Sequence, residues 1–400
     1  MKKHKPAEKI QDIQYFGEYG GINPSISDSS TYTYLAGKTM EKVFDGDKEG
    51  CYLYSRHLSP SNGYLEKTIS AMENSENAQT TASGMAAISS SILQICNSGD
   101  EIISSRTIYG GTYALMKNFL SKFDIKTNFV DITNTKSIES KITNKTKIIF
   151  CESISNPLLE VADIKSISTL AKKYNLKLII DNTFTPLIFS PIELGADIVI
   201  HSLTKFINGA SDTVGGIICS NNEFIKNLID VNSGASMLLG PTMDSFRSNS
   251  ILKNIRTLHI RMKQHSRNTK YLAEKFQELG IKTYYPGLKN HPQHDLMKST
   301  YNQEFGFGGI LVINIETIKN AYSLMESMQK KNIGYLAVSL GFYKTLFSAP
   351  GASTSSEIPE KEQTKMGLSD GMVRISVGID NNIEQTFEKI KSCLIETEII

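Results

Sequence analysis

The sequence places chemically active side chains directly after two apolar segments. One apolar segment leads into Asp181, and the next such segment leads into Ser202, Thr204 and Lys205. Taken singly, each residue has an ordinary explanation, such as a turn cap for Asp181 or a solvent-exposed charge for Lys205. If the two segments are neighbouring strands of a sheet, a carboxylate, two hydroxyls and an amine converge on one crevice. We therefore predict a functional site at this edge of the sheet.

This set of groups matches what pyridoxal 5'-phosphate needs from a protein. Its aldehyde needs a lysine amine, its ring nitrogen needs an acidic partner, and its phosphate needs hydroxyl and backbone donors. Residues Ser83, Gly84 and Met85 begin a predicted helix, whose N-terminus offers free N–H groups to an anion, although a plain helix cap is the ordinary alternative. We predict pyridoxal phosphate as cofactor, with Lys205 as its Schiff-base lysine and Asp181 beside its ring nitrogen.

Short apolar runs alternate with amphipathic helical patterns around these residues. Predicted strands at 176–180 and 196–200 are accompanied by predicted helices that begin at Ser83 and span 163–174. Alternation of this kind predicts an α/β fold with a mostly parallel sheet covered by helices on both faces. Ligands of such sheets bind at the carboxyl ends of the strands.

The chain is long enough for two domains. Residues 1–60 carry polar and turn-forming stretches and predict an extended arm, while residues 61–250 contain the strand and helix alternation. A long helical segment over 250–279 predicts a connection between domains, and residues 251–400 predict a smaller α+β domain. Within that domain, the Ser-, Thr- and Pro-rich stretch 349–365 predicts a mobile loop.

Composition argues for a small-molecule partner. The chain has 43 basic and 41 acidic residues, which gives no excess charge for nucleic acid or an anionic membrane. The five cysteines are scattered and form no C-x-x-C pair, so we predict neither a disulfide framework nor a metal site. The His291–His294 spacing is interpreted as a solvated loop. No signal-peptide or membrane-spanning pattern occurs, and we predict a cytoplasmic enzyme.

Seven short motifs occur in a fixed order along the chain. They lie at residues 54–56, 82–87, 109–112, 152–157, 181–183, 201–205 and 373–378. In this order they resemble the Cys/Met-metabolism pyridoxal-phosphate enzymes, which include cystathionine γ-synthases and lyases, methionine γ-lyases and O-acylhomoserine sulfhydrylases. The resemblance covers about residues 52–378. It implies a fold-type I pyridoxal-phosphate enzyme, with a large mostly parallel-sheet domain and a smaller C-terminal α+β domain.

The resemblance implies roles in holding the cofactor phosphate. Tyr54 and Arg56 would reach the phosphate of a neighbouring subunit, which makes a homodimer the minimal active unit and a homotetramer the expected assembly. Exposed side chains in an arm are the ordinary alternative for these two residues. Within the same subunit, the phosphate would be bound by backbone N–H groups of Gly84 and Met85 and by the hydroxyls of Ser202 and Thr204.

It also implies roles near the ring and the substrate. Tyr109 would lie over the pyridine ring and could donate a proton to a departing sulfur, and Asn156 would hydrogen-bond the ring's phenolic oxygen. A packing tyrosine and an Asn-Pro turn are the ordinary alternatives. Arg374 would bind the substrate carboxylate through two parallel contacts, a geometry that guanidinium offers and ammonium does not. Lys205, released by the incoming amino acid, would move protons.

The segment 337–341 matches the one that lies near the substrate side chain, where Ser339 and Val338 are expected to bind the substrate. Enzymes that handle cystathionine typically carry glutamate at the position of Val338, and an apolar residue suits a methyl thioether or an acyl ester better. One residue argues against a methionine γ-lyase: Gly111 occupies a position where those enzymes usually have cysteine.

We predict a methionine γ-lyase type of γ-elimination that gives 2-oxobutyrate, ammonia and a thiol. The alternatives are a γ-replacement enzyme, either an O-acetylhomoserine sulfhydrylase or a cystathionine γ-synthase, and a cystathionine lyase. A non-catalytic family member is a remote alternative, because it would be expected to lose Lys205, Asp181 or Arg374, and all three are present.

Overall fold

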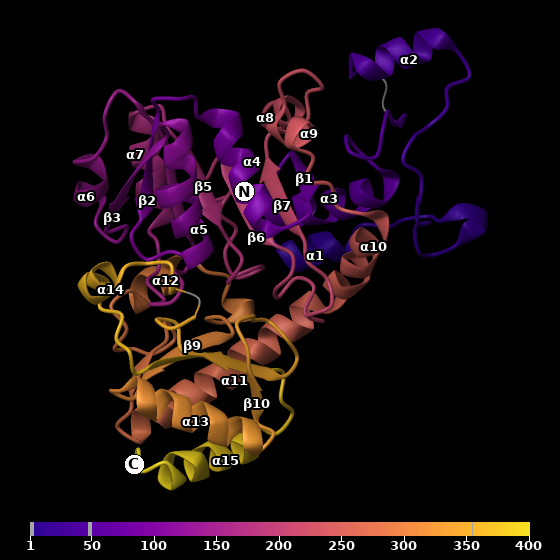
Figure 1. Ribbon diagram of the computed structural model, residues 1–400. Coiled ribbons are helices and arrows are strands. Elements are labelled where there is room, and N and C mark those ends of the chain that lie inside the picture. The colour runs from indigo at the N-terminus through magenta and orange to yellow at the C-terminus, as the bar shows by residue number, and fades with distance from the viewer. Residues whose placement is uncertain (1–3, 47–49, 354) are drawn as a thin grey trace.

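Over residues 4–46, 50–353 and 355–400, which the computed structural model describes, the chain forms two β-sheets (Figure 1). The larger sheet has the strand order β1-β7-β6-β5-β4-β2-β3, and the smaller has the order β10-β11-β12-β9-β8. The larger sheet contains β1 (Asn77–Thr81), β2 (Glu101–Ser105), β3 (Lys126–Val130), β4 (Thr146–Glu152), β5 (Lys177–Asp181), β6 (Ile198–Ser202) and β7 (Gly216–Ser220).

The larger sheet is parallel except at β7, which runs antiparallel to both β1 and β6. Its central strands β4, β5 and β6 have apolar middles because both faces of the sheet are covered. On β4, Ile148 and Phe150 belong to one buried cluster, while Ile149 and Cys151 belong to the cluster on the other face. The predicted α/β architecture with a mostly parallel sheet is confirmed.

Helices cover both faces of this sheet. Helix α4 (Gly84–Ile95) packs on one face against β6 and β7, whereas α3 (Pro60–Glu73) and α7 (Ile164–Lys173) contribute to the cluster on the other face. The other helical segments here are α5 (Gly110–Ala114), a π-helical turn at Leu115–Phe119, a 3-10 turn at Leu120–Phe123, α6 (Thr135–Glu139), α8 (Asn222–Leu228) and α9 (Ala235–Leu239).

Side-chain caps fix where two of the predicted helices begin. The Ser83 hydroxyl accepts the Ala86 N–H at 3.1 Å at the start of α4, and the Asp163 carboxylate accepts the Ser166 N–H at 3.1 Å at the start of α7. Such caps satisfy backbone donors that have no partner inside the helix. The predicted start at Ser83 is confirmed, and its first turn faces the carboxyl ends of the strands.

The single helix predicted over 250–279 is wrong. The structure has α10 (Ser245–Asn254), a 3-10 turn at Ile255–Thr257 and α11 (Leu258–Glu278). Thr257 Oγ1 and Arg261 Nη2 both donate to the Asn254 carbonyl, at 3.1 and 3.0 Å. Side-chain donors thus hydrogen-bond the carbonyl of the last residue of α10. Arg261 also donates to the carbonyls of Phe206 and Ile207, which directly follow Lys205.

The smaller sheet and its helices form a second core. Figure 1 shows α11 running from the larger-sheet part into this unit, where it packs with α13 and α15. The unit contains β8 (Lys282–Tyr284), α12 (His294–Thr300), a 3-10 turn at Gln303–Phe305, β9 (Ile310–Asn314), α13 (Ile318–Lys330), β10 (Gly334–Leu336), β11 (Thr345–Ser348), α14 (Glu360–Met366), β12 (Met372–Ser376) and α15 (Ile383–Glu396).

Two loop interpretations change. The stretch 349–365 predicted as a mobile loop includes most of α14, and its Ile358 is buried in the core cluster that contains Ile88 of α4; Thr354 lies outside the described residues. The solvated loop around His291 and His294 is also wrong. His291 is buried, and the His294 ring stacks on Phe307 at 5.3 Å between centroids.

The N-terminal segment contains α1 (Pro6–Gln11), a 3-10 turn at Glu18–Gly20 and α2 (Gly37–Phe44). Helix α1 packs on α3, whereas α2 stands away from both sheets in Figure 1. Large apolar side chains of this segment are fully exposed in the single chain, including Tyr19 and Leu35. The domain boundaries at residues 60 and 250 stay predictions.

None of the helices in the described ranges combines the length and the apolar character needed to cross a bilayer. Over the same ranges, His, Cys, Asp and Glu side chains form no group of three or more that could hold a metal ion.

A close contact between β7 and the start of α4 gives the first prediction. A Cβ on Gly216 would lie 2.2 Å from the Ser83 carbonyl oxygen, whereas a Cβ on Gly63 in α3 would meet open space. We expect Gly216→Ala to lower the free energy of unfolding by about 1–3 kcal/mol, as overpacking does. Gly63→Ala, the control, should leave it equal or higher. Chemical denaturation followed by circular dichroism measures both, and equal stability of the two variants would contradict the prediction.

Candidate active site

A cavity of about 290 Å³ lies at the carboxyl ends of the parallel strands and is closed on one side by the smaller-sheet unit. The larger-sheet part and the smaller-sheet unit both contribute to its lining. Most of the residues predicted from the sequence meet in this cavity. The predicted residues that line it are Gly84, Met85, Tyr109, Asn156, Asp181, Ser202, Thr204, Lys205, Val338 and Arg374.

Lys205 follows β6 and points its amine into the cavity. Its Nζ donates to the Ser339 hydroxyl at 3.2 Å, which brings Ser339 into contact with the site. Burial lowers the pKa of the Lys205 amine to about 8, and the positive charge of Arg374 lowers it further in the same direction. Because the charged form is disfavoured, a substantial fraction of the amine is neutral near pH 8 and can act as a nucleophile or base.

Asp181 ends β5 and is held by Thr183. The Asp181 Oδ1 atom accepts the Thr183 N–H at 2.9 Å and the Thr183 hydroxyl at 2.5 Å. Thr183 Oγ1 in turn accepts the Ser202 N–H at 2.8 Å, which ties the end of β5 to the end of β6. Burial raises the pKa of Asp181, so a cation beside it, such as a protonated ring nitrogen, would offset the cost of its charge.

The start of α4 forms an anion cradle with Ser202. A Cβ on Gly84 would lie 2.8 Å from the Ser202 Cβ, so only glycine leaves the backbone accessible there. Since the first N–H groups of a helix have no acceptor inside it, and Ser83 accepts that of Ala86, those of Gly84 and Met85 remain for an anion. The Thr204 hydroxyl lines the cavity, but it donates to the Gly215 carbonyl at 3.3 Å.

Tyr109 forms one wall of the cavity. Its side chain is 40% exposed, and its ring lies so close to Gly111 that a Cβ there would be 2.6 Å from Tyr109 Cε1. Burial, followed by the negative charge of Glu357, raises the pKa of the Tyr109 phenol. The phenol therefore keeps its proton at neutral pH and can donate it.

Arg374 on β12 reaches the cavity from the smaller-sheet unit. It is buried, and its Nη1 donates to Asn156 Oδ1 at 3.1 Å, while its Nη2 donates to the carbonyls of Val338 and Ser339, both at 3.4 Å. Because a guanidinium only donates, the Asn156 amide must turn its oxygen toward Arg374, which leaves its NH₂ group for another acceptor. Burial lowers the pKa of Arg374 to about 10, so it stays charged at neutral pH.

Tyr54 and Arg56 lie outside the cavity lining of the single chain. Arg56 Nη1 donates to the Met237 carbonyl at 2.7 Å, and its guanidinium lies 5.7 Å from the centre of the Tyr54 ring. Tyr54 is 42% exposed. The predicted contact with a neighbouring subunit's cofactor therefore stays a prediction.

Three further residues belong to this region although the sequence reasoning assigned them no role. Thr183 and Glu152 line the cavity. Both lie in the motifs described above: Thr183 is two residues after Asp181, and Glu152 is four residues before Asn156. His201 lies behind the site on the opposite face of β6, where its Nε2 is 2.7 Å from Oε1 of the buried Glu73. The one sequence signal for these three residues is that each lies close in the chain to a residue that we predicted for the site.

Comparisons with known proteins agree with this site. The family model for "Cys/Met metabolism PLP-dependent enzyme" matches residues 9–394. A methionine γ-lyase from Arabidopsis thaliana is 41% identical over 98% of this chain and 90% of its own, and a cystathionine γ-lyase from Dictyostelium discoideum is 36% identical over 90% of each. A crystal structure from Campylobacter jejuni that carries a pyridoxyl-lysine 5'-monophosphate superposes with a TM-score of 0.90, at 26% identity, over 98% of this chain and 100% of that one.

The chain belongs to the Cys/Met-metabolism family of pyridoxal-phosphate-dependent enzymes. It is a fold-type I enzyme of sulfur amino-acid metabolism, and pyridoxal 5'-phosphate is its cofactor. The cavity fits this group, since it offers a lysine amine of lowered pKa, an acidic partner in Asp181 and the cradle between Gly84 and Ser202.

The environment of Lys205 gives the second prediction. In cofactor-free protein, labelling of Lys205 by an amine-reactive reagent should be half-maximal near pH 8, because only the neutral amine reacts. Arg374→Met removes a positive charge and should move this midpoint to higher pH, whereas Arg374→Lys, the matched control, should move it less. Peptide mapping by mass spectrometry follows the reaction. A midpoint at the ordinary lysine value in the unmodified protein would contradict the lowered pKa.

Proposed function

We propose that this enzyme is a methionine γ-lyase, which converts methionine and water into 2-oxobutyrate, ammonia and methanethiol. The observation that carries this proposal is the apolar side chain of Val338 in the cavity wall, next to the carbonyl contacts of Arg374. Val338 is 64% exposed in the single chain. It offers the distal ammonium group of cystathionine no carboxylate to pair with, whereas an apolar methyl thioether needs no such partner. The similarity to a methionine γ-lyase over 98% of the chain supports the same choice.

In this proposal, the chain's own residues bind the substrate and move its protons. Arg374 binds the substrate carboxylate, and Ser339 assists it from the neighbouring segment. Pyridoxal phosphate, when bound, supplies an electron-accepting ring that stabilises negative charge at the substrate α-carbon. Lys205 takes the α-proton and moves protons from and to the β-carbon, so that loss of the β-proton supplies the electron pair that breaks the bond between the γ-carbon and sulfur. Tyr109 donates its phenolic proton to the departing sulfur. The lowered pKa of Lys205 and the raised pKa of Tyr109 suit these opposite roles.

We assign the remaining predicted residues to the cofactor. Asp181 faces the ring nitrogen, and the Asn156 amide donates to the ring's phenolic oxygen, in keeping with the orientation that Arg374 imposes on it. The phosphate is bound at the start of α4. Its proposed ligands there are the backbone N–H groups of Gly84 and Met85 and the hydroxyls of Ser202 and Thr204, of which Thr204 would have to release the Gly215 carbonyl.

A γ-replacement enzyme that uses O-acetylhomoserine is the second candidate. The same Val338 wall accommodates an acyl ester, and Gly111 stands against the Tyr109 ring where methionine γ-lyases usually carry a larger residue. The two candidates differ in the second reactant. Water gives 2-oxobutyrate and ammonia, whereas sulfide or a thiol replaces the γ-substituent.

The third prediction separates these candidates. Purified holoenzyme should release 2-oxobutyrate from methionine with a kcat/KM about tenfold or more above that for cystathionine, since the distal ammonium lacks a partner. Lys205→Ala should lower methionine turnover by about a thousandfold. An assay of 2-oxobutyrate measures both. If methionine is not turned over and sulfide is captured efficiently from O-acetylhomoserine, the second candidate replaces the first.

We also propose a homo-oligomer in which Tyr54 and Arg56 complete the cavity of a neighbouring subunit. Their position outside the cavity of the single chain supports this, and so do the exposed apolar side chains of the arm, such as Tyr19 and Leu35. Exposed apolar surface of this kind is typical of protein interfaces.

The fourth prediction tests shared sites by complementation. Arg56→Ala and Lys205→Ala should each be nearly inactive alone. When the two variants are co-expressed, random pairing should restore about a quarter of the wild-type activity, because each hybrid dimer then contains one site without either substitution. Methionine turnover and sedimentation velocity measure the outcome. No recovery in hybrids whose formation is verified would place Arg56 in its own subunit's site.

A further inference from the structure

Glu152 is a buried carboxylate that touches both loops flanking the cavity. It ends β4, directly beside Asp181 in the parallel register of β4 and β5, and it is 7% exposed. Its Oε1 accepts the backbone N–H of Tyr109 at 3.0 Å, and its Oε2 accepts the backbone N–H of Asn156 at 2.7 Å. One side chain therefore fixes the main chain of the two residues that we assign to opposite parts of the cofactor ring.

The geometry requires a carboxylate of this length. Two N–H donors approach from two different loops, and only a carboxylate presents two acceptor oxygens. Glutamine would offer one oxygen and confront the other N–H with its own NH₂ group, while aspartate is shorter by one carbon.

Keeping Glu152 in this place has a cost in stability. Burial raises its pKa to about 8, and the neighbouring Asp181 carboxylate acts in the same direction, against the opposing effect of the two backbone N–H groups. An apolar residue at the end of β4 would avoid this cost. The two hydrogen bonds therefore offset an unfavourable burial, which points to a positional role for the residue.

The effect of Glu152 extends to the smaller-sheet unit. The Asn156 backbone N–H donates to the Glu152 carboxylate, and the Asn156 side-chain oxygen accepts from Arg374 Nη1 at 3.1 Å. A shift of the Asn156 backbone would therefore also move the amide that orients toward the cavity, and the guanidinium that we assign to the substrate carboxylate. Tyr109, Asn156 and Arg374 are thus joined through one carboxylate.

We propose that Glu152 is a positioning residue for this enzyme, which sets the Tyr109 ring and the Asn156 amide against the bound cofactor by holding both backbones with one carboxylate. The proposal rests on the roles of Tyr109 and Asn156 in the proposed function. It does not depend on which sulfur amino acid is the substrate.

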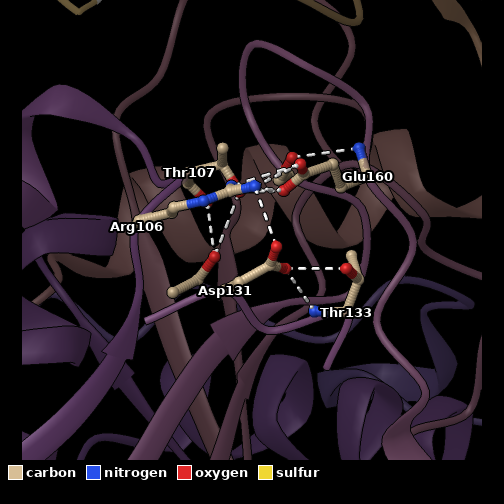
Figure 2. Close-up of polar contacts among 7 residues, drawn as sticks. Arg106, Thr107, Asp131, Thr133 and Glu160 are labelled. Atoms are coloured by element: carbon tan, nitrogen blue, oxygen red, sulfur yellow. Dashed lines mark hydrogen bonds and ion pairs between the residues drawn. The ribbon is translucent and has the colours of Figure 1, made fainter. Parts of the chain in front are cut away.

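Glu160 offers a matched control in the same two loops (Figure 2). Its carboxylate accepts from Arg106 Nη1 at 3.2 Å and from the Thr107 hydroxyl at 2.5 Å, and Arg106 Nη2 also donates to Asp131 at 3.1 Å. Figure 2 shows Arg106 lying between the two carboxylates. Glu160 joins the loop before Tyr109 to the loop after Asn156, as Glu152 does, but it is not among the described residues that line the cavity.

The fifth prediction compares Glu152→Gln with Glu160→Gln. In cofactor-free protein, Glu152→Gln should weaken the binding of pyridoxal phosphate by about tenfold or more, as expected for a buried donor left without its acceptor. In the holoenzyme it should reduce the visible circular dichroism of the cofactor, and it should lower kcat for methionine more than it changes KM. Glu160→Gln should lower the denaturation midpoint while cofactor affinity, dichroism and kcat stay within about twofold. Absorbance titration, dichroism and steady-state kinetics provide the measurements.

Two outcomes would overturn the proposal. One is a Glu152→Gln enzyme with cofactor affinity and dichroism like wild type, and the other is an equal loss in Glu160→Gln at matched stability. If Glu152→Gln does not fold, Glu152→Asp keeps the charge but shortens the reach, and the same losses are expected of it. Affinity and dichroism are measured without substrate, so a wild-type enzyme that fails to turn over methionine would contradict the proposed function and leave this test intact.

Discussion

The hydrogen-bond register between β4, β5 and β6 is the constraint on which the site depends. It places Glu152 beside Asp181, and Asp181 beside Ile200, two residues before Ser202. Because successive side chains of a strand point to opposite faces, a slip of one residue would turn Asp181 away from the cavity. The apolar residues on both faces hold this register, since a slip would also exchange their two buried clusters.

The second requirement is that the smaller-sheet unit meets this edge of the larger sheet. Arg374 enters the cavity from β12 and contacts Asn156, and Lys205 contacts Ser339. Two hydrogen bonds in the cavity therefore join the larger-sheet part to the smaller-sheet unit. Burial then works on these groups in opposite directions. It makes the amine of Lys205 easier to deprotonate and the phenol of Tyr109 harder to deprotonate. One buried cavity thereby supports both a base and an acid.

Much of this could be predicted because it depends on local sequence. Apolar runs ending at Asp181 and before Lys205, and a helix beginning at Ser83, are patterns within single segments. The features that were missed depend on contacts between distant segments. Glu152 is defined by the backbones of two loops, the break after Asn254 by the Arg261 side chain, and the burial of His291 by tertiary packing. The role of Arg56 stays a proposal, because in the single chain its guanidinium contacts the Met237 carbonyl and does not line the cavity.

Arg261 links the geometry of the whole molecule to the reactive amine. It stands near the start of α11, the helix that leads into the smaller-sheet unit, and its guanidinium holds the carbonyls of Phe206 and Ile207 as well as that of Asn254. A swing of α11 would therefore pull on the main chain one residue after Lys205. The bonds to Phe206 and Ile207 tie the start of α11 to the chain segment that carries the reactive amine, so the position of Lys205 depends on the helix that leads into the smaller-sheet unit.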